Sequence, residues 1–284
     1  MERLQEALSR ARDRRKESGE SGGDAGQARG PIMPRAPQQS TQDGDPVSAT
    51  WRALPQYMPD EALLKSHRIV SFFGGRPASP FDMMRTKIVQ QAKTNGWRRI
   101  VITSPTPRCG KSTITTNLAF ALAKQADLRT LVVEADMRRP ELARLLGIRE
   151  PHAFAQVLAG KAAPEDNMIA YGTNLAFATN QQPTANPAEL LQSVKAQEVV
   201  ASLEAKFAPD IILFDAAPML ASDDTTGLLQ YMDAALIVAA AELSTIEEVD
   251  QIETEIAAIT NVMGVVLNKT RYAPTVYGYD EHYY

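Results

Sequence analysis

The sequence predicts an α/β fold in which a mostly parallel β-sheet is flanked by helices on both faces. From about residue 66 onward, short apolar runs alternate with longer amphipathic stretches, and the short runs contain no regular polar positions. Uninterrupted apolar runs are typical of strands that are buried on both faces. Their alternation with helical stretches indicates parallel strand pairing. Hydrophobic residues make up 44% of the 284 residues, which suffices for a well-buried core.

Six strands and five helices are expected in this part of the chain. The strands are expected at residues 99–103, 130–134, 174–178, 211–214, 234–240 and 262–267. The helices are expected at residues 80–95, 111–125, 140–146, 187–206 and 244–260. No internal repeat is evident, so a single nucleotide-binding domain over residues 66–270 is the expected unit.

Both ends of the chain differ in composition from this domain. Residues 1–16 place apolar side chains at helical spacing, which fits a short helix that docks on a partner or a frayed, solvated terminus. Residues 17–65 are rich in Gly, Ser, Pro, Gln and Asp, and we expect a flexible, disordered linker there. Residues 271–284 form a tyrosine-rich tail.

Composition excludes several classes of protein. The net charge of −4 shows no basic excess, so we expect no nucleic-acid partner. A single cysteine, Cys109, excludes a disulfide framework and a cysteine-based zinc site. No apolar run approaches the roughly 20 residues of a membrane span, and residues 1–16 lack the apolar core of a signal peptide. We therefore expect a cytoplasmic protein that reaches a membrane only through a partner or a surface patch.

A phosphate-binding loop is predicted between the strand at 99–103 and the helix that follows it. The loop ends in Gly-Lys-Ser-Thr, and this strand–loop–helix order is that of a P-loop. Its expected nucleotide-binding residues are Arg108, Cys109, Gly110, Lys111, Ser112 and Thr113. Backbone N–H groups would face the phosphates, Lys111 would add a positive charge, and Ser112 would bind Mg²⁺. Pro105 stands where the pattern has its first glycine, so a chance Gly-Lys-Ser-Thr is the alternative.

Carboxylates follow two of the other predicted strands. Glu134 and Asp136 stand at the end of one strand, and Asp215 stands at the end of another. Ligands of open α/β sheets bind at this edge, and Mg²⁺ prefers oxygen ligands. A single acid at a strand end is usually a helix cap. Together with the loop, however, these acids indicate a site for a nucleotide and Mg²⁺.

The tail concentrates the tyrosines of the chain. Five of the 8 tyrosines lie there, namely Tyr272, Tyr277, Tyr279, Tyr283 and Tyr284. The tail has no periodicity and contains Pro and Gly, so it does not read as part of a core. Two interpretations remain: the tyrosines present hydroxyls to a γ-phosphate, or they bind a partner or a second protomer. Each added phosphate would bring about two negative charges.

Residues 68–284 resemble the bacterial tyrosine kinases of the capsular and exopolysaccharide system, which are P-loop proteins related to the partitioning ATPases. The resemblance rests on the order of several motifs: 110–113, 134–140, 186–191, 215–218, 264–268 and the tyrosine tail. It implies autophosphorylation of the tail with ATP and Mg²⁺ as cofactors. Lys111 would then hold the phosphates, and Ser112 would bind Mg²⁺ with help from Asp215 through water. Asp136 would be the base, with Glu134 as the other acid of that motif.

The resemblance also implies partners and a location. Phosphorylation would take place between subunits of a homo-oligomeric ring and would be reversed by a phosphotyrosine phosphatase. An integral-membrane regulator of polysaccharide chain length, here a separate chain, would recruit the kinase to the inner face of the plasma membrane. Asn268 resembles the residue that reads the adenine edge.

Four departures from the family pattern leave other functions open. Arg108 stands where the family has Gly, Glu134 where it has Asp, and Ala217 where it has Pro, and the oligomerisation motif keeps only Arg85. One alternative is an ATPase that works as a nucleotide switch, although Thr106 replaces the extra lysine of those ATPases. The other is a degenerate kinase that serves as a scaffold for an envelope polysaccharide assembly.

Overall fold

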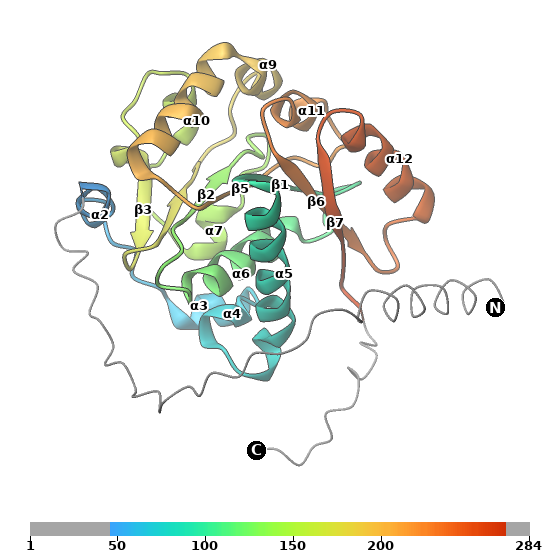
Figure 1. Ribbon diagram of the computed structural model, residues 1–284, viewed down its shortest axis with the longest axis horizontal. Helices are drawn as coiled ribbons and strands as arrows, with labels where there is room; N and C mark the ends of the chain where they lie inside the picture. Colours follow the sequence, from blue (N-terminus) through green and yellow to red (C-terminus); the bar gives the residue numbers. More distant parts are fainter. Residues whose placement is uncertain (1–45, 271–284) are drawn as a thin grey trace, which may run out of the picture. The chain divides into compact units, whose positions relative to one another are not determined.

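The computed structural model describes residues 46–270, which form a seven-stranded sheet in the order β3-β4-β2-β5-β1-β6-β7 (Figure 1). The strands are β1 Arg99–Thr103, β2 Thr130–Glu134, β3 Met168–Tyr171, β4 Leu175–Ala178, β5 Ile211–Asp215, β6 Ala234–Ala240 and β7 Asn261–Asn268. All neighbouring strands pair in parallel except β3, which runs antiparallel to β4. The predicted mostly parallel sheet is therefore confirmed.

Helices cover both faces of the sheet. One face packs against α2 Pro46–Arg52, α8 Phe154–Leu158, α9 Pro187–Gln192, α10 Val194–Phe207, α11 Asp224–Leu229 and α12 Ile246–Ala257. The other packs against α3 Glu61–Ser66, α4 Val70–Phe73, α5 Ser79–Asn95, α6 Lys111–Ala123 and α7 Leu142–Leu146. Two short 3₁₀ turns, Arg76–Ala78 and Glu165–Asn167, complete the described elements.

The central strands β1, β2 and β5 are apolar at their inner positions because each face of the sheet has its own core. In β1, Ile100 and Ile102 pack on the α6 side, whereas Val101 packs on the α10 side. β5 repeats this division, with Leu213 on the first side and Phe214 on the second. The period of two in side-chain direction thus explains why these runs lack polar residues.

Several elements differ from the prediction, since α2, α3, α4, α8 and α11 were not predicted. Two further differences concern a predicted helix and a strand. The expected helix at 187–206 is two helices, because Ser193 is extended and its side chain caps α10 by accepting a hydrogen bond from the Ala196 N–H. β3 was not predicted. It has only four residues, and its antiparallel pairing with β4 has no counterpart among the other strands.

The expected linker over residues 17–65 is wrong for residues 46–65. Trp51 is fully buried, and its indole N–H donates to the Phe207 carbonyl at 2.7 Å. Tyr57 lies at the other face, where its hydroxyl donates to the Leu146 carbonyl at 2.7 Å. The polar composition of the expected linker gave no indication that Trp51 and Tyr57 would be buried. Residues 1–45 and 271–284 lie outside the described residues, as do the predictions made for them.

Within residues 46–270, none of the helices is both long and apolar enough to cross a bilayer.

Candidate active site

The predicted phosphate loop joins β1 to α6 with a backbone that suits glycine. Arg108 and Gly110 both have positive φ angles, of 70° and 92°. A side chain at Gly110 would meet the Asn268 amide, since an added Cβ would lie 2.4 Å from Asn268 Nδ2. Arg108 thus adopts the left-handed conformation that glycine favours, and its side chain is exposed to solvent.

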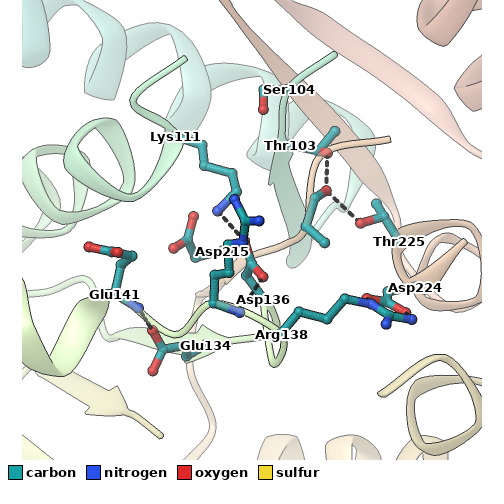
Figure 2. A network of polar contacts seen from close by, with 12 residues as sticks. Thr103, Ser104, Lys111, Glu134, Asp136, Arg138, Glu141, Asp215, Asp224 and Thr225 are labelled. Carbon is teal, nitrogen blue, oxygen red and sulfur yellow. Dashed lines mark hydrogen bonds and ion pairs between the residues drawn. The ribbon is translucent and has the colours of Figure 1, made fainter. Parts of the chain in front are cut away.

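An ion pair lies at the start of α6. Lys111, the first residue of the helix, places its Nζ 2.6 Å from Asp136 Oδ2, and both side chains are buried (Figure 2). Burial lowers the pKa of Lys111, but the negative charges of Asp215 and Asp136 outweigh it, so this pKa lies above its ordinary value. Lys111 thus stays charged at the place where the loop would receive phosphates.

Asp215 closes β5 beside this pair. Its Oδ1 accepts a hydrogen bond from the Thr115 hydroxyl at 3.3 Å, while its buried Oδ2 accepts none. Burial raises the pKa of Asp215, and the charge of Lys111 partly offsets this rise. The Ser112 hydroxyl is near enough to lower this pKa as well. A free, buried carboxylate oxygen near a hydroxyl fits a hard cation that needs oxygen ligands.

The residues present fit Mg²⁺ bound jointly with a nucleotide. Over residues 46–270, no group of three His, Cys, Asp or Glu side chains converges as a metal site. Mg²⁺ commonly takes one or two protein ligands and completes its octahedron with water and phosphate oxygens. Ser112 and Asp215 are the side chains that would hold it here.

Glu134, the other predicted acid, is fully buried and bonded to backbone N–H groups. Its Oε1 accepts hydrogen bonds from the Glu141 and Leu142 N–H groups at 2.5 and 2.7 Å, and its Oε2 accepts one from the Asn180 N–H at 2.7 Å. Burial raises its pKa to about 8, although these three donors act in the opposite direction. The extra methylene of glutamate thus lets the carboxylate join the start of α7 to the end of β4.

The remaining predicted loop residues support its backbone. Asn268 donates its amide N–H to the Cys109 carbonyl at 2.8 Å, so the end of β7 is fastened to the loop. The Cys109 thiol is buried and donates to the Thr106 carbonyl at 3.2 Å. Thr113, in the first turn of α6, accepts a hydrogen bond on its carbonyl from Asn117 Nδ2 at 2.9 Å.

Four polar residues at this edge were not predicted from the sequence. The hydroxyls of Thr103 and Thr225 both donate to the Ala217 carbonyl at 2.7 Å. Arg138 forms two hydrogen bonds with Asp224, Nε to Oδ2 at 2.6 Å and Nη2 to Oδ1 at 2.9 Å. Arg138 lies within a motif that the sequence did single out, but nothing in the sequence indicated its partner 86 residues away.

The phosphoacceptor tyrosines predicted in the tail cannot be placed, because Tyr272, Tyr277, Tyr279, Tyr283 and Tyr284 lie outside the described residues.

Residues 100–277 match the CobQ/CobB/MinD/ParA nucleotide binding domain. The chain belongs to this family. It is 31% identical over 204 residues to the putative tyrosine-protein kinase EpsB of Ralstonia nicotianae, and this match covers 70% of the chain and 26% of the relative. The chain spans about a quarter of the length of the first curated relatives it matches.

Solved structures show the same kinship. The kinase domain of Escherichia coli tyrosine kinase ETK superposes with a TM-score of 0.56 at 29% identity, covering 64% of this chain and 72% of that one. The chimerical protein CapA2B2 superposes with a TM-score of 0.65 at 26% identity, covering 79% and 97% of the two chains. The resemblance to bacterial tyrosine kinases that the motifs indicated is therefore confirmed.

Proposed function

We propose that this chain is an ATP-dependent protein-tyrosine kinase that phosphorylates the tyrosine cluster at its own C-terminus. The observation that carries the proposal is the buried contact of Lys111 with Asp136 beside Asp215, at the carboxyl edge of the parallel sheet. This arrangement pairs a cation for phosphates with a carboxylate that can accept a proton. The kinship with tyrosine kinase domains and the five clustered tyrosines support the same function.

In the proposed reaction, a tyrosine oxygen forms a bond to the γ-phosphorus of ATP while the bond to the β–γ bridging oxygen breaks. ADP leaves with that bonding pair, and the phenolic proton passes to Asp136. Lys111 and the backbone N–H groups of the loop would hold the phosphates, and Ser112 and Asp215 would hold Mg²⁺. Bound Mg²⁺ supplies positive charge against the phosphate oxygens. The contribution of the chain is therefore mainly positioning and charge neutralisation.

Asn268 is proposed to contact the adenine edge, since its side chain already lies against the phosphate loop. Glu134 is proposed to support the site through the backbone and not to act on the substrate. The proposed setting follows the resemblance: a homo-oligomer at the inner face of the plasma membrane, recruited by a separate membrane regulator of exopolysaccharide or capsule chain length. A phosphotyrosine phosphatase would reverse the modification.

Phosphate incorporation tests this function. The protein is incubated with MgATP, and its intact mass and peptide map are compared with those of Lys111→Met. Lys87→Met serves as the matched control, because Lys87 is exposed on α5. We expect phosphates on tail tyrosines in the wild type and in Lys87→Met, and none in Lys111→Met. Circular dichroism verifies that each variant is folded, because removing Lys111 leaves a buried carboxylate without its partner.

The other outcomes separate the alternatives. Steady release of inorganic phosphate without protein labelling would contradict the kinase and indicate a nucleotide-switch ATPase. Absence of MgATP binding would contradict both enzymes and indicate a scaffold.

A further inference from the structure

The loop that carries Asp136 connects β2 to α7 and is fastened at both of its ends. At its start, the N–H groups of Ala135 and Asp136 donate to the Asp215 carbonyl at 2.9 and 2.8 Å. At its end, the Glu134 carboxylate accepts hydrogen bonds from the N–H groups of Glu141 and Leu142, at the start of α7. Between these two points the Arg139 N–H donates to Asp136 Oδ1 at 3.1 Å and the Met137 carbonyl accepts from the Thr184 N–H at 2.9 Å. The side chain of Arg138 adds a contact with a helix outside the loop.

Arg138 reaches across to α11 and forms a bidentate pair with Asp224 (Figure 2). The Asp224 side chain is 0% exposed, whereas that of Arg138 is 51% exposed. A planar guanidinium that meets both oxygens of a carboxylate fixes direction as well as distance. Because the acid is locked in the protein interior, it is the loop that this pair orients.

The first turn of α11 also contacts the segment that follows Asp215, the last residue of β5. Thr225 follows Asp224 in the helix and donates its hydroxyl to the Ala217 carbonyl, two residues after Asp215. Thr103, at the end of β1, donates to the same carbonyl. The start of α11 therefore holds both carboxylate loops and, through Thr103, meets the strand that leads into the phosphate loop.

We propose that Arg138 and Asp224 form a positioning pair, through which α11 holds Asp136 in register with Lys111 for phosphoryl transfer. This inference rests on the proposed kinase function. It assigns Arg138 a role through Asp136 and not through contact with the substrate. Loss of the pair lowers the rate of transfer and leaves nucleotide affinity nearly unchanged, because the Lys111 loop has its own anchors at Asn268 and Cys109.

The test compares Arg138→Lys with Arg99→Lys, each of which keeps the charge and removes bidentate geometry. Arg99 is a matched control, since its guanidinium donates to both carboxylate oxygens of Glu204, at 2.8 and 2.5 Å. It is the first residue of β1 and therefore lies at the opposite edge of the sheet from the candidate site. We expect Arg138→Lys to slow tail phosphorylation by about 10- to 100-fold with MgATP affinity within about threefold. Arg99→Lys should stay within about twofold of the wild-type rate. Equal rates for the two variants would overturn the proposal.

A double-mutant cycle with Asp136→Asn distinguishes an effect of Arg138 on the position of Asp136 from a general loss of activity. If Arg138 acts through Asp136, Arg138→Lys adds no further loss in the Asp136→Asn background. Losses that multiply in the double variant would contradict the proposal.

Hydrogen exchange gives a readout that does not depend on activity. The backbone amides of residues 135–139 and of Glu141 should exchange faster in Arg138→Lys than in the wild type, and Arg99→Lys should leave them unchanged. Unchanged exchange in Arg138→Lys would overturn the pair as an anchor even if the wild type transferred no phosphate. A wild type that transfers none, with faster loop exchange in Arg138→Lys, would contradict the kinase function and keep the anchor.

Discussion

Arg108 is a residue in a conformation that its own side chain disfavours. Its φ of 70° lies in the left-handed region, where an L-residue costs about 1–2 kcal/mol more than glycine. The Lys269 ammonium donates to the Arg108 carbonyl at 2.6 Å, which helps to hold this conformation. The loop thus retains the backbone that presents N–H groups to phosphate, at a cost in stability.

Replacing Arg108 by glycine should therefore stabilise the protein by about 1 kcal/mol, part of the gain being lost to the greater freedom of glycine in the unfolded chain. Urea denaturation of Arg108→Gly and the wild type measures the difference. Arg149→Gly is the matched control, because Arg149 is exposed and has no positive φ, so glycine there should destabilise. An Arg108→Gly variant that is less stable than the wild type would contradict the strain at this residue.

At the scale of elements, Glu134 connects β2, α7 and the end of β4 through three backbone donors. Its pKa is raised from 4.5 to about 8, so between these values the folded protein binds a proton that the unfolded chain releases. The free energy of unfolding contributed by this group therefore falls as pH rises through that window and levels off above it.

Glu134→Gln should lack this slope, because an amide does not titrate. At low pH its free energy of unfolding should also be about 1–3 kcal/mol lower than that of the wild type, because the amide N–H₂ of glutamine would face a backbone N–H and neither group could accept a hydrogen bond. Denaturation curves at several pH values between 4.5 and 8 measure both effects. Parallel pH profiles would contradict the raised pKa.

The elements that sequence reasoning predicted are those whose signal is local. β1, β2 and β6 have the predicted bounds because the inner positions of a strand buried on both faces are apolar. β3 was not predicted, although it has four residues like its antiparallel partner β4, which was predicted. The break at Ser193 was not predicted, because α9 and α10 share one apolar pattern and only the Ser193 cap separates the two helices.

At the scale of the whole molecule, the candidate site joins segments that are far apart in the sequence. The motifs predicted that Lys111, Asp136 and Asp215 meet, because the ends of parallel strands share one edge. The Arg138–Asp224 pair could not be predicted, since it depends on where the topology brings α11. The burial of Trp51 could not be predicted either, because it depends on a hydrogen bond to Phe207 at the end of α10, far away in the sequence.

The central claim is that Asp136 accepts the tyrosine proton at a nucleotide site built around Lys111. The most direct test is the rate of tail phosphorylation in Asp136→Asn, measured by intact mass beside MgATP affinity measured by calorimetry. We expect a loss of at least about 100-fold in rate with affinity within about threefold, as for removal of a general base. A variant that phosphorylates its tail at the wild-type rate would contradict the assignment of Asp136 as the base.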